Sequence, residues 1–433
     1  MPGSRLLDHY SDVKPLLGAL GPAWLSELRE AGFRHYAESG APSTRDEEFR
    51  YIPLPELEEV AWKPAYGAIL ERADLDETSL GTPNAATIVF VNGQLAPDLM
   101  SPAELPDGVY VGPLEDELPL QGVLGSIATL RGKLGSTNDE RFVALNSAHL
   151  GEVAVVSVPR NVTVERPIHI RYVTTATEGE MAVYPRTLIL LGENAEAVVV
   201  ESFEGLNGRV LDVPVTEVNL DPSARLQHVR YVQEAPQSVH IANVYVRQAE
   251  NSVYDAVGIH FGGLKIRADI NADVRGEHTE TWLNGVNVGD GHQILDNHTR
   301  IDHAVPNCQS FEVYKSILKD DSVGVFNGKI FVYEDAQKTD AKQTNQALLM
   351  SPRATMNTKP QLEIFADDVK CTHGATIGGL RQDALFYLRA RGIPKAQAES
   401  LLVYAFAAEV IDRVKPDEYR EAFEKALYKK LES

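Results

Sequence analysis

The feature that most constrains the fold is a long central stretch of β-rich sequence, from about Val153 to Ile377. Short runs of β-forming residues are interrupted there every dozen or so residues by turn residues, and no helical pattern comes between them. This arrangement excludes a doubly wound sheet and leaves a sandwich, a barrel or a solenoid such as a β-helix. The length favours the solenoid, because a β-helix grows by repetition. No strict repeat is visible, so periodicity alone leaves the choice open.

Individual runs indicate how such strands should lie. Between Ile266 and Val274, apolar residues alternate with polar ones, as expected for a strand with one face in the core and the other in water. The dipeptide Asn327-Gly328 is typical of a tight turn, so we expect a turn between two strands at that point.

The sequence on either side of this stretch has a different texture, and we expect three domains. Residues 1–140 should form an N-terminal mixed, partly helical domain. Residues 141–379 should form the β core, and residues 380–433 a C-terminal helical domain. Near the N-terminus, residues 24–40 predict a helix, and Thr44 with Glu47 has the spacing of a capping box for a further helix. Residues 88–93 predict a strand that runs into a tight turn.

The C-terminal part is predicted to contain three helices. The first covers residues 380–391 and the second residues 394–414, with Pro394 at a first-turn position. The last helix carries an apolar stripe with a spacing of four residues. Its members are Tyr419, Phe423, Leu427 and Leu431. Such a stripe either packs on the solenoid or docks into the groove of a partner.

Charge and hydropathy exclude several classes of function. The chain has 41 basic and 62 acidic residues and a net charge of −21, which disfavours nucleic acid and anionic membrane surfaces as partners. No signal-peptide pattern is present, and no apolar run approaches the ~20 residues of a membrane span. We therefore expect a cytoplasmic protein.

The cysteine content limits the chemistry further. Only Cys308 and Cys371 occur, which argues against a disulfide framework and fits a reducing compartment. An iron–sulfur cluster usually takes about four protein ligands, mostly thiolates, so this chain alone cannot hold one in the ordinary way. Any role with such a cluster must be shared with another chain.

Most other motifs have a structural explanation. The nearest approach to a phosphate-binding loop, residues 324–330, is one residue short and has Ile330 in place of the hydroxyl that holds magnesium. The acidic pairs at residues 320–321 and 367–368 point to opposite faces if extended, so solvated turns are expected there. The closest group of histidines matches no zinc-ligand pattern. Its members are His292, His298 and His303.

Cys371 and His373 form a different kind of pair. In an extended strand, residues two apart project from the same face, which would place a thiolate beside an imidazole. Lys370 would favour the thiolate if the site is wet, whereas burial would oppose it. Taken alone, the pair is better explained as a small buried cysteine beside a structural histidine.

A series of short sequence motifs, which follow one another in a fixed order, changes this interpretation. The motifs are FNGKI (326–330), AQKTDA (336–341), Gln343, Asn345, PQLEI (360–364), ADDVKCTHGATIG (366–378) and LFYLRARGI (385–393). They resemble the SufB/SufD family of iron–sulfur cluster assembly scaffolds. Weaker similarity extends the resemblance to about two thirds of the chain and includes residues 145–146, 158–160 and 167–170. In the SufB branch a glutamate follows the motif histidine, whereas here Gly374 does, so the chain is similar to the SufD branch.

The resemblance implies a right-handed parallel β-helix between two partly helical ends. It also implies a non-catalytic scaffold subunit in a complex with a SufB-like subunit and a SufC-like ATPase, which docks on the C-terminal helices. The cluster would be transient and shared at the interface with the SufB-like subunit. His373 matches the motif histidine of the SufD branch, and Cys371 is a second candidate ligand. A reduced flavin accompanies some such complexes, and the sequence indicates no site for it.

Two other functions are compatible with a β-helix. One is a structural adaptor without metal chemistry; the other is an enzyme that acts on acidic polysaccharides, which the missing secretion signal and the acidic charge disfavour. Whether the isolated chain pairs with a second copy is left open, although an open β-helix end presents unpaired edges.

Overall fold

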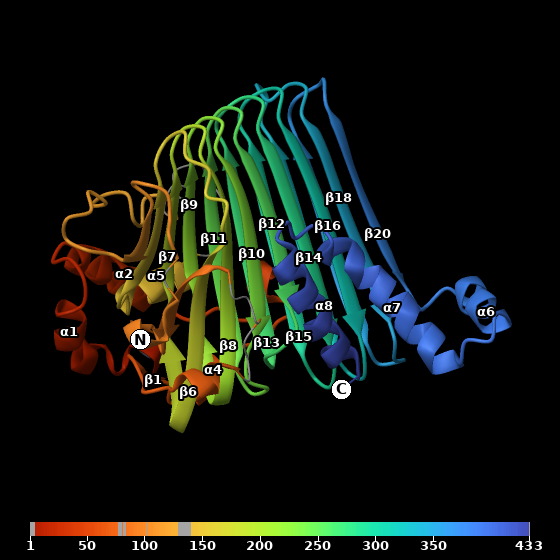
Figure 1. The fold of residues 1–433 in the computed structure, drawn as a ribbon, viewed down its shortest axis with the longest axis horizontal. Helices are drawn as coiled ribbons and strands as arrows, with labels where there is room; N and C mark the ends of the chain where they lie inside the picture. Colours follow the sequence, from red (N-terminus) through yellow and green to blue (C-terminus); the bar gives the residue numbers. More distant parts are fainter. Residues whose placement is uncertain (1–4, 77–79, 81–83, 102, 129–139, 433) are drawn as a thin grey trace.

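The computed structural model describes residues 5–76, 80, 84–101, 103–128 and 140–432 of the 433-residue chain. Its body is a β-helix of stacked strands, flanked by helices at both ends of the chain (Figure 1). This confirms the mainly β solenoid class and settles the choice that periodicity left open.

The β-helix has two faces of parallel strands. The first face is β6 (Ile168–Val183), β8 (Glu196–Asp212), β10 (Arg225–Gln233), β12 (Val253–His260), β14 (Glu280–Gly289), β16 (Gln309–Leu318), β18 (Asp340–Leu349) and β20 (Lys370–Gly378). The second face is β5 (Val153–Val158), β7 (Arg186–Leu191), β9 (Val215–Leu220), β11 (Val239–Gln248), β13 (Lys265–Val274), β15 (Ile294–His303), β17 (Val323–Val332) and β19 (Thr355–Ile364).

Successive turns of the β-helix stack in register. Residues 225, 253, 280, 309, 340 and 370 lie above one another on the first face, so that one turn takes about 30 residues. Side chains alternate between the interior and the outside along each strand. A residue's spatial neighbours are therefore found one turn away in the sequence.

The N-terminal segment packs against the first turns. Its elements are η1 (Arg5–Leu7), α1 (Tyr10–Gly18), α2 (Leu25–Ser39), η2 (Glu47–Phe49), α3 (Glu56–Glu59), β1 (Lys63–Pro64), α4 (Arg72–Asp76), β2 (Ala86–Val91), β3 (Gln94–Leu95), η3 (Pro97–Leu99), β4 (Tyr110–Pro113) and α5 (Arg141–Ala148). β2 pairs with β6, and β4 pairs antiparallel with β5. We call the end of the β-helix formed by β5 and β6 the covered end.

Two of the three N-terminal predictions are confirmed. The predicted helix is α2, and the predicted strand and tight turn are β2 and the link to its antiparallel neighbour β3. The capping box at Thr44 is wrong. Asp46 accepts a hydrogen bond from the Ser43 backbone N–H and precedes the short 3-10 helix η2, so these residues form a turn.

The C-terminal segment forms α6 (Gln382–Ala390), α7 (Lys395–Ile411) and α8 (Asp417–Glu432), as predicted within a few residues. α7 and α8 lie across the outside of the first face, whereas α6 projects away from the body (Figure 1). In the predicted apolar stripe, Tyr419, Phe423 and Leu427 are fully buried against strands of that face, with Leu431 partly buried beside them. The stripe therefore packs on the solenoid. The three-domain division stays a prediction.

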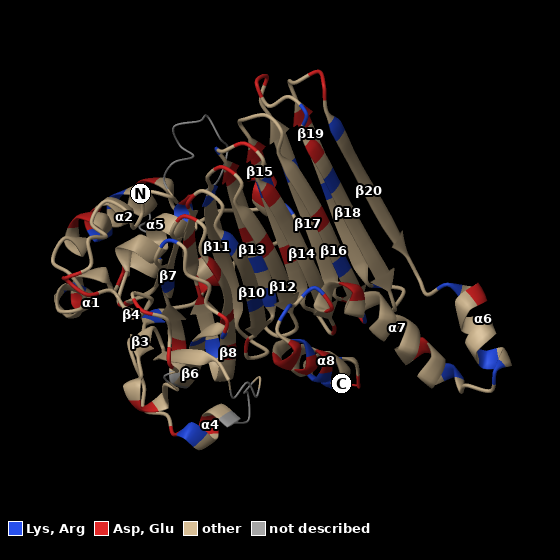
Figure 2. Ribbon diagram, turned by 45° about the horizontal axis from the view of Figure 1, so that its top comes forward, with Lys and Arg blue, Asp and Glu red and all other residues tan. Residues whose placement is uncertain are grey.

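Two expectations about strands need correction. The polar side of β13 is not open to water, because Arg267, Asn271 and Asp273 are all buried. Figure 2 shows basic and acidic residues next to one another across the strands of this second face, and Arg267 is paired with Asp269 and Asp296.

The second correction concerns Asn327-Gly328, which lies inside β17 and forms no turn. Gly328 instead makes room for a neighbouring side chain. A Cβ at this position would lie 2.1 Å from Nε2 of Gln343, so glycine leaves space for that side chain.

None of the helices within the described residues combines the length and apolar character needed to cross a membrane.

Candidate functional site

The last turn of the β-helix carries the two candidate ligands. β20 pairs with β18, and no further strand pairs with β20 or β19 among the described residues. Cys371 lies in register with Ala341, and His373 lies in register with Gln343. Both partners are buried, so Cys371 and His373 continue a row of interior-facing positions to the end of the solenoid. We call this end, formed by β19 and β20, the open end.

The two side chains differ in exposure. His373 is exposed, and its ring makes no hydrogen bond or ion pair within the described part of the chain. Cys371 is half-buried against a small cluster of apolar residues. Burial raises the pKa of the Cys371 thiol, so burial outweighs any effect of Lys370. The strand therefore presents a free imidazole next to a thiol that is mostly protonated at neutral pH.

The row behind His373 contains polar side chains that the sequence did not reveal as candidates. Glu312, Gln343 and His373 occupy matching positions on β16, β18 and β20. The carboxylate of Glu312 accepts a hydrogen bond from Thr299 Oγ1 at 2.6 Å and a long one from Gln343 Nε2 at 3.5 Å. Burial raises the pKa of Glu312 to about 7. A titratable carboxyl thus lies in the interior, two strands behind the exposed histidine.

These residues could have been found only by stacking the sequence on itself at the length of one turn. Glu312, Gln343 and His373 are far apart in the chain and share no local motif. Their common feature is the register of three strands. A search restricted to short windows cannot detect such a group.

The open end also exposes apolar side chains. Phe365 is 60% exposed, Ile377 is 44% exposed and Ile364 is 36% exposed. The outer backbone edges of β19 and β20 have no strand partner in the described ranges. Unpaired edges with apolar side chains are typical of a surface that another protein covers.

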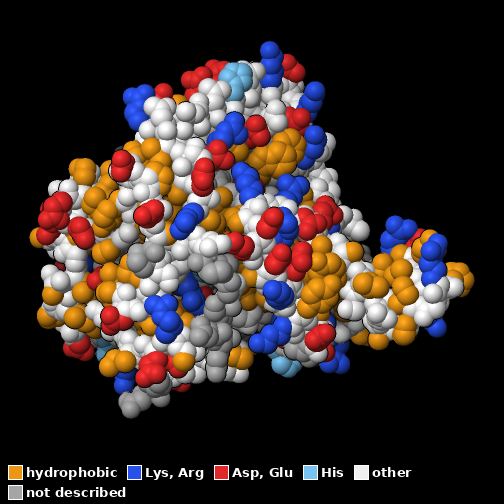
Figure 3. All heavy atoms as spheres, viewed as in Figure 1, with side chains coloured by type: hydrophobic (Ala, Val, Ile, Leu, Met, Phe, Trp, Pro, Cys, Tyr) orange, Lys and Arg blue, Asp and Glu red, His pale blue; other side chains and the backbone are white. Residues whose placement is uncertain are grey.

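A second apolar surface lies on α6. Phe386 is 73% exposed and Tyr387 is 57% exposed. Figure 3 shows hydrophobic side chains on the projecting lobe that contains this helix. By contrast, the buried stripe of α8 faces the solenoid and is not available to a partner.

The remaining sequence candidates form no site. The acidic pairs at residues 320–321 and 367–368 lie in a turn and a bend between strands, as expected. His292 is exposed, His298 is ion-paired with Glu48 and Asp296, and buried His303 is hydrogen-bonded to Ser310. These three histidines do not converge on a common point.

Two family models and several relatives match this chain, and they indicate the same family. Residues 172–406 match the family model described as the SUF system FeS cluster assembly SufBD core domain, and residues 3–170 match that of the SufBD protein N-terminal region. The chain is 32% identical to the iron–sulfur cluster assembly protein SufD of Escherichia coli over 88% of this chain and 86% of the relative.

Two further relatives are similar over comparable lengths. An iron–sulfur cluster assembly SufBD family protein of Synechocystis is 32% identical over 86% of this chain and 84% of its own length. The chloroplastic protein ABCI7 of Arabidopsis thaliana is 33% identical over 92% of this chain and 84% of its own length.

Proposed function

Because the chain belongs to the SufBD family and has a role in iron–sulfur cluster assembly, we propose that it is a non-catalytic scaffold subunit of the SufD type. It would act in the cytoplasm, together with a SufB-like subunit and a SufC-like ATPase. The observation that carries this proposal is the position of His373, exposed and without a ring partner among the described residues, on the last strand of the β-helix.

The open end suits a shared cluster site. A neutral imidazole is a competent iron ligand, and the chain has too few cysteines to complete a cluster by itself. A SufB-like subunit that covered the edges of β19 and β20 would bring its own ligands next to His373. The iron–sulfur cluster would be transient cargo at this interface. Cys371 is the weaker ligand candidate. Its thiol must lose a proton to bind iron, and burial raises the pKa of that thiol.

The ATPase would bind at α6. Phe386 and Tyr387 provide exposed apolar area on a helix that projects from the body, whereas α8 is held against the strands. Deleting residues 416–433 would expose the face that Tyr419 and Phe423 cover and destabilise the solenoid, so deletion cannot test docking. Replacing both Phe386 and Tyr387 by serine is the sharper experiment. It should abolish co-purification of the ATPase, while the matched substitution of Ile69, which is 98% exposed on the N-terminal segment, should not.

The cluster role is tested by His373→Ala in the complex with both partners. We expect iron and sulfide per complex to fall several-fold, with unchanged partner association and thermal stability, because the exposed ring forms no hydrogen bond or ion pair with the described residues. Cys371→Ala should have a smaller effect on iron content. Thr372→Ala, on the opposite face of the same strand, is the matched control. Wild-type iron and sulfide in the His373 variant would favour a structural adaptor without metal chemistry.

A further inference from the structure

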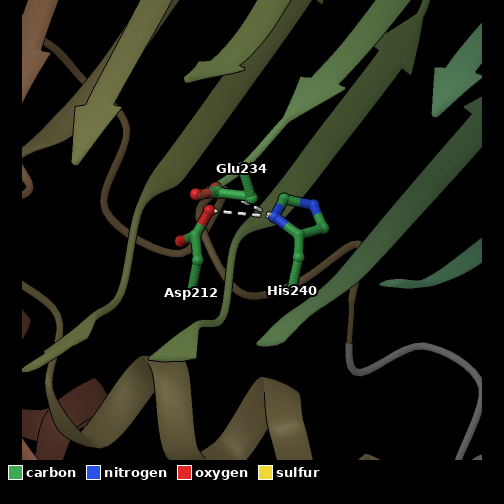
Figure 4. Close-up of side chains that lie close together, drawn as sticks. All are labelled: Asp212, Glu234 and His240. Carbon is green, nitrogen blue, oxygen red and sulfur yellow. Dashed lines mark hydrogen bonds and ion pairs between the residues drawn. The ribbon is translucent and has the colours of Figure 1, made fainter. Parts of the chain in front are cut away.

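A group of three buried ionisable side chains lies inside the β-helix, far from the open end in the stacking order. Asp212 is the last residue of β8, and His240 is its register partner on β11. Glu234 comes from the corner between β10 and β11. Asp212 and His240 are 0% exposed, and Glu234 is 2% exposed. Figure 4 shows the three side chains pointing toward one another.

The distances between their ligand-type atoms fit a small metal ion. His240 Nδ1 lies 3.0 Å from Asp212 Oδ2 and 3.5 Å from Glu234 Oε1, and the three atoms all lie within 4.8 Å of one another. Bonds of about 2.0–2.2 Å at tetrahedral angles would place ligand atoms roughly 3.3–3.6 Å apart. The two printed distances are close to this spacing and the third is at most 4.8 Å, so side-chain movements of about 1 Å or less would admit one ion.

The group of Asp212, Glu234 and His240 lacks some of the partners that buried polar atoms usually have. Neither carboxylate forms an ion pair with a lysine or arginine in the part of the chain that the structure describes. Thr174 donates a hydrogen bond to Glu234 Oε2 at 3.2 Å. Asp212 Oδ1 and His240 Nε2 are buried without a hydrogen-bond partner among the described residues, and Glu234 Oε1 has only the 3.5 Å ion pair with His240.

A neighbouring group shows what a satisfied site looks like in the same interior. Glu201 is also fully buried, but it accepts hydrogen bonds from Arg230, His228 and two threonines. These contacts hold its pKa down at about 2 despite burial. No arginine or lysine takes this place beside Asp212 and Glu234 among the described residues, and their one ion-pair partner there is His240.

The surroundings leave room for the group and a route to it. A Cβ on Gly205 would lie 2.7 Å from Glu234 Oε2, so glycine at this position makes space for the carboxylate. Glu234 is also part of the wall of a cleft of about 940 Å³ between the corners of the β-helix and α8. An ion could approach Glu234 from this cleft, as a binding site requires.

We propose that Asp212, Glu234 and His240 bind one divalent first-row transition-metal ion inside the β-helix. Two carboxylates and one neutral imidazole form a mixed oxygen and nitrogen ligand set whose two negative charges neutralise such an ion. The site contains no thiolate and is independent of the function proposed for His373.

The test uses the purified full-length chain, stripped with a chelator and titrated with Co²⁺ or Zn²⁺ alone. We expect one Zn²⁺ per chain in equilibrium dialysis and a rise in melting temperature on Zn²⁺ addition. Co²⁺ should produce visible d–d absorption without the intense near-ultraviolet band of thiolate-to-cobalt charge transfer. Asp212→Asn and Glu234→Gln keep the side-chain shape, and each should weaken binding by roughly 100-fold or more.

The control is the double variant Cys371→Ser and His373→Ala, which removes the proposed cluster ligands and should keep the Zn²⁺ and Co²⁺ signals. The proposal is overturned if the wild-type chain binds no stoichiometric metal or if both carboxylate variants bind it like the wild type. It is also overturned if the Zn²⁺ and Co²⁺ signals disappear in this double variant. This double variant keeps Asp212, Glu234 and His240, so it decides the question even if a carboxylate variant fails to fold.

Discussion

The two ends of the β-helix are built from the same kind of strand, yet they face different surroundings. At the covered end, β2 pairs with β6, β4 pairs with β5, and Arg186 and Glu217 form a fully buried ion pair. At the open end, β20 is exposed along most of its length. The difference shows that a strand of this fold becomes core or surface according to whether another element packs against it. An end without its own cover is suited to cover by another subunit.

The largest effect on stability is expected from Glu217→Ala, which removes the buried ion pair described above. Glu217 pairs with Arg186 and accepts hydrogen bonds from the backbone N–H groups of Gly125, Ile127 and Ala128. Its loss leaves a fully buried guanidinium without its carboxylate, which should reduce the free energy of unfolding by about 3–5 kcal/mol. Urea denaturation measures this change.

The matched control for Glu217→Ala is Glu47→Ala, which removes an exposed ion pair with Lys359 near the open end. Its cost should stay within about 1 kcal/mol. Equal losses in the two variants would contradict the contrast between the ends.

An intermediate effect is expected from Glu312→Gln, in the interior behind the open end. Burial raises the pKa of Glu312 in the folded chain to about 7, above its value in the unfolded chain. The folded state therefore binds the proton more tightly. This contribution to stability is complete below about pH 4.5 and is lost as the pH rises to 7, with a total of roughly 3 kcal/mol.

The Glu312→Gln variant lacks this proton, so its stability relative to the wild type should increase between pH 4.5 and 7 and then level off. Melting temperatures of both proteins across this range measure the difference. A constant difference would mean that the carboxyl does not titrate in this window.

A smaller effect on stability, but a clear one on assembly, is expected from Ile377→Lys on β20. The side chain is 44% exposed, so the free energy of unfolding should change by no more than about 0.5 kcal/mol. Placing a charge on the open end should weaken binding of the SufB-like subunit at least tenfold, as measured by surface plasmon resonance. Ile69→Lys is the control, and equal binding by both variants would argue against the open end as the interface.

The smallest effect concerns the two thiols. Cys308 is fully buried, whereas Cys371 is half-buried near the open end. Iodoacetamide should label one thiol in the native chain, at a rate a few-fold below that of a free cysteine because burial raises the pKa of Cys371. Mass spectrometry identifies the site. Labelling that persists in Cys371→Ser would contradict this assignment.

Much of the fold could be predicted because β-rich runs, turn residues and helix signals act locally. Periodicity alone left a sandwich, a barrel and a solenoid open. The family resemblance around Cys371 and His373 predicted the β-helix. The error at Asn327-Gly328 has the opposite origin. A dipeptide typical of turns lies in the middle of β17, which pairs with β15 and β19, and glycine there leaves space for Gln343 of the neighbouring turn.

The candidate sites were only partly accessible from the sequence. His373 was predicted from its motif, but the groups around Glu312 and around His240 depend on which strands stack. Asp212 and His240 become neighbours only when the register of β8 and β11 is known. His240 alone in a strand indicates an ordinary core histidine, and only its two buried carboxylate neighbours change that interpretation.

The in-register stacking of turns has a consequence for how this body can change in length. Each turn adds one strand spacing of about 4.8 Å to both faces, without altering the strands before or after it. Gaining or losing a whole turn between β14 and β20 would therefore move the open end by one strand spacing relative to helices α7 and α8. The number of turns therefore sets, in fixed steps, how far the open end lies from α7 and α8.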